Sequence, residues 1–187
     1  MGTSQDYVSR AGYKLEGAMR QLQVDPAGCV CADLGSNVGG FVDCLLRHGA
    51  AKVYAIDTGY GTLAWKLRRD PRVVVMERTN AMHAALPEPV DLVTIDVGWT
   101  RQHHILPAAA RMLKAAGRVL TLVKPHYEAP TKLLRDGVLP AEHLETVVGQ
   151  VRRQIREMRW TITGECPSPL PGAAGNREVW LLLTASR

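Results

Sequence analysis

The chain has 187 residues, 46% of them hydrophobic, which is enough for one domain with a sizeable core. The formal net charge of +5 permits a polyanionic partner but does not require one. No apolar run could cross a bilayer as a helix and no signal-peptide pattern is present, so we expect a cytoplasmic protein without a membrane partner. Cys29 and Cys31 alternate along an expected strand and cannot form the C-x-x-C turn of a zinc site, so we predict core thiols and no metal.

Five apolar, β-rich segments alternate with helical patterns over the first two thirds of the chain. This alternation predicts a parallel sheet covered by helices. The expected strands are residues 30–34, 53–56, 73–76, 92–95 and 119–123. The expected helices are residues 40–48, 62–69, a short one near Ala81, and 102–115, which Gly117 would end. A further helix is expected before the first strand, between residues 7 and 22.

The pattern changes after the fifth strand. Residues 125–140 are rich in Pro, Lys and Gly and predict a long loop of the kind that often serves as a lid, followed by a helix at 141–159. The last two apolar runs, 160–164 and 178–184, have no helix between them, which indicates an antiparallel pair. We therefore predict one domain over residues 1–187, with a Rossmann-like, doubly wound α/β core at 29–184 whose seven-stranded sheet has one antiparallel strand.

Residues 33–41, DLGSNVGGF, follow the first expected strand and open a helix. Gly35 and Gly39 allow φ > 0 and close approach of the backbone to a ligand, although such glycines can also form only a tight bend. The spacing D-x-G-x-x-x-G-G differs from the dinucleotide fingerprint G-x-G-x-x-G. An acid at Asp33 would repel a pyrophosphate but accept a hydrogen bond from an ammonium group. S-adenosylmethionine carries such an ammonium and no phosphate, so we predict it as the cofactor.

Two further positions extend the predicted cofactor site. Asp57 ends the second apolar run, where an acid conventionally receives ribose hydroxyls in doubly wound sheets. Asn80, just past the third strand, is expected near the adenine. The predicted cofactor-binding residues are Asp33, Gly35, Ser36, Gly39, Gly40, Phe41, Asp57, Asn80 and Asp96.

Three charged residues from distant parts of the chain converge on the same predicted edge of the sheet. Asp96 and Lys124 each end a parallel strand, and Glu178 begins the antiparallel one. Each has a simple alternative role as a helix cap, a solvated strand end or a surface ion-pair partner. Their convergence on a cofactor edge favours a catalytic site.

Residues 9–15, SRAGYKL, resemble the S-R-A-x-x-K-L signature of the FtsJ-like RNA 2′-O-methyltransferases. Segments 33–46, 57–68, 77–80 and 175–178 are most similar to the TlyA (haemolysin A-like) branch of that family, and the resemblance extends from about residue 7 to the C-terminus. It implies a class I S-adenosylmethionine-dependent enzyme that methylates a ribose 2′-hydroxyl, with ribosomal RNA as partner. It also implies a Lys-Asp-Lys-Glu tetrad at Lys14, Asp96, Lys124 and Glu178. Lys124 would contact the hydroxyl as a general base or as a positioning group, and the sequence leaves both open.

The chain also departs from the TlyA branch. That branch carries an N-terminal S4-like RNA-binding module, whereas this chain begins almost directly at the methyltransferase domain, so a partner could supply RNA-binding surface. Gly98 and Trp99 replace the Ser-Phe usual in the branch. Trp99 could stack on an RNA base or pack in the core. Two alternatives therefore stay open: a methyltransferase for a small molecule or protein, and a non-catalytic RNA-binding protein of the same fold.

Overall fold

The computed structural model describes residues 6–185, with every side chain in that range except that of residue 173. A seven-stranded sheet has the order β3-β2-β1-β4-β5-β7-β6. The strands are β1 Val30–Leu34, β2 Lys52–Ile56, β3 Val73–Met76, β4 Val90–Ile95, β5 Leu113–Val123, β6 Trp160–Pro167 and β7 Val179–Ala185. The helices are α1 Ala11–Leu22, α2 Gly40–Arg47, α3 Trp65–Arg68, α4 Gln102–Met112, α5 Pro125–Glu128 and α6 Ala141–Glu157, with short 3-10 turns at Thr131–Leu133 and Ala173–Gly175.

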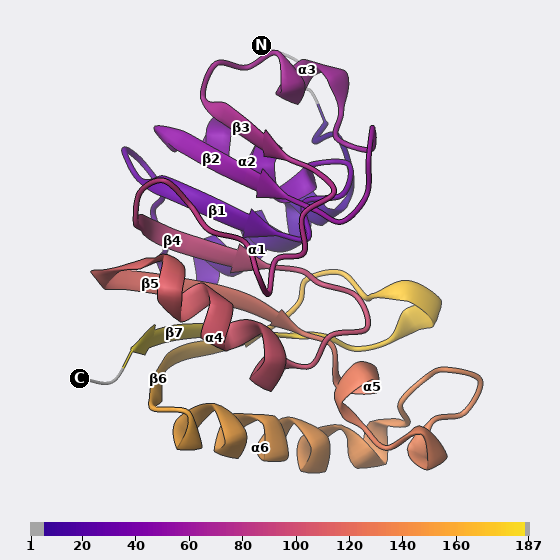
Figure 1. The fold of residues 1–187 in the computed structure, drawn as a ribbon. Coiled ribbons are helices and arrows are strands. Elements are labelled where there is room, and N and C mark those ends of the chain that lie inside the picture. Colours follow the sequence, from indigo (N-terminus) through magenta and orange to yellow (C-terminus); the bar gives the residue numbers. More distant parts are fainter. Residues whose placement is uncertain (1–5, 186–187) are drawn as a thin grey trace.

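Helices cover both faces of the sheet, with α1 and α2 behind it and α4 and α6 in front (Figure 1). The central strands are therefore buried on both faces and read as continuous apolar runs. Alternate residues of one strand enter different cores: Cys31 packs with α1 and α2, while Ala32 packs with α4 and α6. This is the doubly wound α/β architecture that the sequence predicts.

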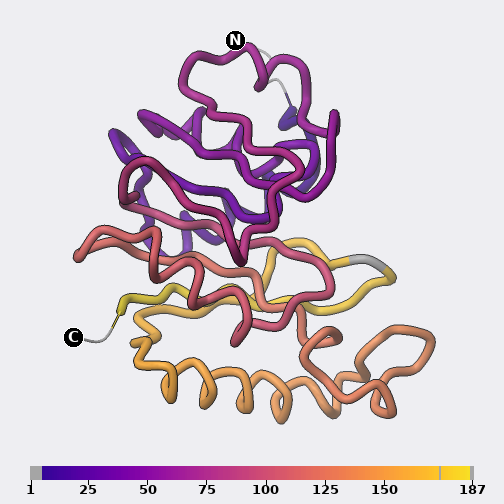
Figure 2. Tube along the Cα trace, viewed as in Figure 1, coloured from indigo at the N-terminus to yellow at the C-terminus, as the bar shows by residue number. Residues whose placement is uncertain are grey.

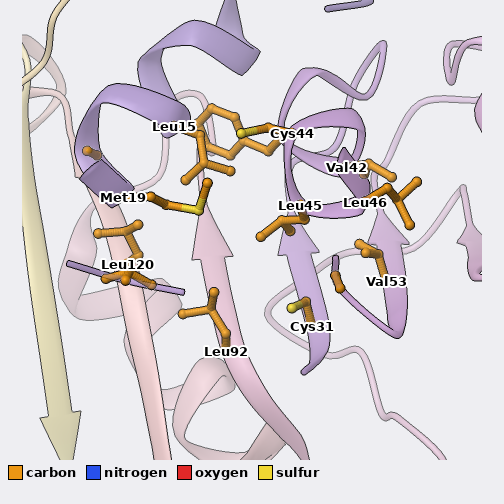
Figure 3. Packing of buried hydrophobic residues seen from close by; sticks show 14 of the residues in the cluster. Leu15, Met19, Cys31, Val42, Cys44, Leu45, Leu46, Val53, Leu92 and Leu120 are labelled. Atoms are coloured by element: carbon orange, nitrogen blue, oxygen red, sulfur yellow. The ribbon is translucent and has the colours of Figure 1, made fainter. Parts of the chain in front are cut away.

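The core behind the sheet brings α1 onto α2. Leu15 and Met19 of α1 lie beside Cys44 and Leu45 of α2, and both helices face the aliphatic side chains of the central strands (Figure 3). Because Leu15 is fully buried, α1 is fixed against the sheet, and Lys14, its neighbour on that helix, is held with it. The N-terminal helix is thus an integral part of the core.

The direction of the strands is as predicted. β7 is antiparallel to both β5 and β6, and it is the one reversed strand among the described residues. Val123 of β5 pairs with Val179 of β7, so the end of β5 meets the beginning of β7. Glu178, expected as the first residue of this strand, lies one position before it.

Several predicted elements are wrong in detail. The helix expected at 62–69 is the shorter α3, since Ala64 is still extended, and the strand expected at 119–123 already begins at Leu113. No helix forms near Ala81, because the Asn80 side chain accepts the Met82 N–H at 2.9 Å and closes a turn instead. The helix expected to reach residue 115 ends at Met112, because Leu113 is already extended and pairs with Val90 of β4. The expected loop 125–140 contains α5 and a 3-10 turn.

Candidate active site

The glycine turn after β1 is shaped by close backbone packing. The N–H groups of Gly35 and Ser36 both donate to the carbonyl oxygen of Ile56, at 2.9 and 3.1 Å. Gly35 has φ 91°, and a Cβ on it would lie 2.5 Å from the carbonyl oxygen of Asp96. Only glycine fits there, because the turn lies against the residue that follows β4.

Gly40 joins the same turn to the N-terminal segment. A Cβ on Gly40 would lie 2.3 Å from the Ser9 hydroxyl oxygen and 2.9 Å from the Ala11 Cβ. This close approach puts Ala11, the first residue of α1, in the wall of a cavity above the turn. Residues of the segment 9–15, SRAGYKL, thus lie against the glycine turn.

A cavity of about 450 Å³ opens at the carboxyl ends of the parallel strands. Eight of the nine predicted cofactor residues line it: Asp33, Gly35, Ser36, Gly40, Phe41, Asp57, Asn80 and Asp96. Gly39 does not. Glycine is required at position 39 for two other reasons. Its backbone has φ 101°, and a Cβ there would lie 2.3 Å from the Leu67 side chain. Ligands of doubly wound sheets bind in this position.

Some residues of the cavity wall were absent from the sequence prediction. Asn37, Thr58, Thr79 and Met82 line it, each adjacent to a predicted residue or in the turn after a strand. Their place after strand ends was the only available signal. No repeat or charge pattern marks them.

Asp33 is the buried acid of the site, with 1% of its surface exposed. Its Oδ1 accepts the Thr94 hydroxyl at 2.8 Å, whereas Oδ2 has no hydrogen-bond partner among the described residues. Burial raises the pKa of Asp33 to about 8, and the charges of Asp96 and Asp57 act in the same direction. A cavity-facing carboxyl with one unsatisfied oxygen fits the ammonium group of S-adenosylmethionine.

Asp57 connects the glycine turn to the end of β2. Its two oxygens accept the N–H groups of Asn37, at 2.8 Å, and of Gly59, at 2.7 Å. The carboxylate is therefore fixed at the cavity wall. Each oxygen retains further lone pairs for hydroxyl donors.

The four predicted catalytic residues form two ion pairs. Lys124 Nζ lies 2.5 Å from Asp96 Oδ1, and both residues line the cavity. Lys14 Nζ donates to Glu178 Oε2 at 2.6 Å, with both side chains buried. Lys124 follows Val123 and Glu178 precedes Val179. Because these two valines pair, one residue of each ion pair lies where the end of β5 meets the beginning of β7.

Trp99 is 88% exposed, so the interpretation of a buried packing residue is wrong. Its backbone has φ 58°, an uncommon value for a residue with a side chain. The indole packs against Tyr127, with ring centroids 4.9 Å apart, and lines the cavity. An exposed indole, backed by the half-buried Tyr127, therefore lies in the wall of the cavity that Lys124 also lines.

The fold and the cavity together define the class of the protein. A doubly wound sheet with this glycine turn and these acids is the architecture of class I S-adenosylmethionine-dependent methyltransferases. A solved Listeria monocytogenes structure described by that activity matches 95% of this chain and 99% of its own, with a TM-score of 0.71 at 15% identity. That likeness concerns the fold.

Sequence comparison supplies the family. The family model described as "FtsJ-like methyltransferase" matches residues 7–185. The 16S/23S rRNA (cytidine-2′-O)-methyltransferase TlyA of Mycobacterium tuberculosis is 41% identical over 95% of this chain and 68% of its own length. A solved structure named as a hemolysin, from Streptococcus thermophilus, covers 100% of this chain and 70% of its own, with TM-score 0.93 and 34% identity. The chain belongs to the FtsJ-like methyltransferase family, and its cofactor is S-adenosylmethionine.

Within residues 6–185, no helix is both long and apolar enough to cross a bilayer.

Proposed function

We propose that the protein transfers a methyl group from S-adenosylmethionine to a ribose 2′-hydroxyl of ribosomal RNA. The observation that carries the proposal is the Asp96–Lys124 ion pair, which lines the same cavity as the predicted cofactor acids Asp33 and Asp57. The TlyA relative, 41% identical, is named for 2′-O-methylation of cytidine in rRNA. We assign Asp33 to the ammonium of the cofactor, Asp57 to its ribose and Asn80 to the neighbourhood of its adenine.

The chain's own residues would bring the acceptor hydroxyl to the methyl group. S-adenosylmethionine, when bound, supplies a methyl group on a positively charged sulfur. Lys124 is held by Asp96 and also donates to the Val97 carbonyl oxygen at 3.3 Å, which fixes its ammonium at the cavity wall. In this position the ammonium orients the 2′-hydroxyl; alternatively, Lys124 in its neutral amine form accepts the hydroxyl proton while the oxygen–carbon bond forms and the bond from that carbon to sulfur breaks.

Trp99 and Tyr127 would hold the acceptor nucleotide. The exposed Trp99 lines the cavity and packs on the half-buried Tyr127, whose ring centroid lies 5.8 Å from the Lys124 ammonium. Single-stranded bases commonly stack on such rings. A base on Trp99 would place its ribose near Lys124.

Lys124→Ala tests the assignment. We expect S-adenosylmethionine affinity to remain within about twofold, and the rate of methyl transfer to rRNA to fall at least about 100-fold, as for loss of an acid–base group. Lys124→Arg should also be inactive, because a guanidinium does not deprotonate and has a different shape. Lys114→Ala, which breaks the exposed ion pair with Asp91 at 2.8 Å, is the matched control and should change neither quantity.

Tritium from labelled cofactor, counted in total RNA, gives the rate, and calorimetry gives the affinity. If the Lys124→Ala variant methylates RNA at the wild-type rate, Lys124 has no role in the mechanism. If the wild-type protein methylates only protein or only a small molecule, the corresponding alternative substrate is favoured. Cofactor binding without any transfer would favour the non-catalytic alternative.

The proposal has consequences for partners and location. It takes the chain as one catalytic domain, acting on ribosomal RNA or a ribosomal subunit in the cytoplasm. A partner that adds RNA-binding surface would raise its affinity for that substrate.

A further inference from the structure

Asn176 connects two loops that are far apart in the sequence. Its side chain is buried, with 4% exposed. The Oδ1 atom accepts the Leu139 N–H at 3.1 Å, and Nδ2 donates to the Gly137 carbonyl oxygen at 3.1 Å. Figure 2 shows both segments, orange and yellow, at the same end of the molecule. One amide thus ties the loop before β7 to residues 129–140.

Residues 129–140 form a separately packed unit. Ala129 and Leu139 are buried with Val147 of α6 in a small cluster of their own, apart from the two main cores. The same unit exposes Lys132 and Arg135. It therefore has both internal packing and a basic surface.

The loop before β7, residues 168–178, in turn confines Glu178. The Ser168 N–H donates to the Glu178 carbonyl oxygen at 2.9 Å, and the Gly172 N–H donates to the Asn176 carbonyl oxygen at 2.8 Å. A Cβ on Gly172 would lie 2.2 Å from Glu178 Oε1, so the loop backbone lies directly against this carboxylate. The other oxygen of Glu178 accepts Lys14. The position of Glu178 thus depends on a loop that Asn176 fastens.

We propose that Asn176 is a positioning residue through which residues 129–140 hold Glu178 against Lys14. The inference rests on the proposed methyl transfer, since Glu178 belongs to its tetrad. RNA that contacts Lys132 or Arg135 would then stabilise the unit that fixes the Lys14–Glu178 pair. Acceptor binding and tetrad geometry become linked through one amide.

Kinetics provide the first test. Asn176→Ala should lower kcat about 10- to 100-fold, as small misplacements of catalytic groups do, with cofactor affinity within about twofold. Asn176→Asp keeps the oxygen that accepts the Leu139 N–H but replaces the amide nitrogen that donates to the Gly137 carbonyl with a second oxygen. This variant should therefore not restore kcat. Ile155→Val truncates a fully buried side chain of α6 that packs in the main core in front of the sheet, in a different cluster from residues 129–140; it controls for lost stability and should keep kcat.

A double-mutant cycle then asks whether Asn176 acts through Glu178. In single-turnover methylation, adding Asn176→Ala to Glu178→Gln should cost less than about twofold beyond Glu178→Gln alone. Multiplicative losses would overturn the proposal. So would a wild-type kcat in Asn176→Ala.

Amide hydrogen exchange tests the same link without activity. In Asn176→Ala, exchange at Ser168 and Gly172 should accelerate together with exchange at Leu139, while Ile155→Val leaves all three unchanged. Acceleration confined to Leu139 would mean that Asn176 does not hold the Glu178 loop, and would overturn the inference. If the wild-type protein methylates no RNA, the proposed function fails, and the exchange result still decides the role of Asn176.

Discussion

Asp33 carries the largest electrostatic consequence of any single residue in the site. Its Oδ2 is buried and unpartnered within the described part of the chain, and the Thr94 hydroxyl satisfies only Oδ1. With its pKa raised to about 8 by burial, about nine-tenths of the carboxyl groups hold a proton at pH 7. An ammonium that binds there favours the ionised carboxylate, so the proton must leave on binding.

We therefore predict that S-adenosylmethionine binding releases close to one proton at pH 7, and that affinity rises with pH until about pH 8. Calorimetry in buffers of different ionisation enthalpy measures the proton count. Asp33→Asn should bind the cofactor weakly and release no proton. A pH-independent affinity between pH 6 and 8 in the wild-type protein would contradict the assignment of Asp33 to the ammonium.

The same group sets a trend in stability. Because Asp33 keeps its proton in the folded state up to about pH 8 but loses it near 3.8 when unfolded, its contribution to the free energy of unfolding falls between these pH values. Relative to wild type, Asp33→Asn should gain stability as pH rises through this window. Urea unfolding of both proteins at several pH values measures this difference.

Sequence reasoning located Asp33 but could not describe its environment. The position follows from its place two residues before Gly35. Its hydrogen bond comes from Thr94, 61 residues away on β4, and no local pattern encodes that contact. Trp99 shows the same limit, since its exposure depends on how the loop after Asp96 leaves the sheet.

At the scale of elements, the glycine turn joins β1 to α2 and forms the floor of the cavity. We predict that Gly35→Ala destabilises the fold by about 1–3 kcal/mol, because φ 91° is strained for alanine and its Cβ would lie 2.5 Å from the Asp96 carbonyl oxygen. Cofactor binding should be lost as well. Thermal unfolding and calorimetry measure both effects.

Gly149 provides the control for that substitution. It lies inside α6, and a Cβ on it would meet nothing within 4 Å. Gly149→Ala should stabilise the helix by about 0.5–1 kcal/mol and leave cofactor affinity unchanged. Equal stability of the Gly35→Ala variant and the wild-type protein would show that the turn can relax and would contradict the packing argument.

Strands were predicted more reliably than helix ends, for a physical reason. A strand such as β4 is buried on both faces, so its apolar run is visible without knowledge of its neighbours. The end of α4 was missed because Leu113 leaves the helix to pair with Val90. Gly117 does not cap the helix. It allows the close approach to β4, since a Cβ on it would lie 3.1 Å from the Val90 carbonyl oxygen. Pairing between distant segments overrode the local pattern.

At the scale of the whole molecule, the reversed strand assembles the candidate site. Because β7 runs antiparallel to β5, its beginning meets the end of β5, and Glu178 arrives beside Lys124. The absence of a helix between the last two strands was sufficient to predict this arrangement. Which lysine would pair with which carboxylate was not predictable, since the Lys14–Glu178 contact spans 164 residues and depends on how α1 packs.

The molecule's cations are partly neutralised, which limits its hold on a phosphate backbone. Lys66 lies 3.0 Å from Asp43, Arg68 pairs with Glu77, and Arg135 lies 3.4 Å from Glu142. Lys14 is buried against Glu178. Cations held in these ion pairs are less available to release counterions from RNA.

We predict that the domain binds RNA weakly and that added salt weakens binding further, each neutralised phosphate contributing about 0.7–0.9 to the log–log slope. Filter binding to ribosomal subunits and to short single strands, at several salt concentrations, measures affinity and slope. Lys132→Ala should lower the slope by one such increment without changing cofactor affinity, whereas Lys114→Ala, at the opposite end of the strands, should not. Tight, salt-insensitive binding would contradict the charge argument. Absence of binding to any RNA would favour a small-molecule acceptor, because a cavity with Asp96 and Lys124 in its wall could still orient a hydroxyl group.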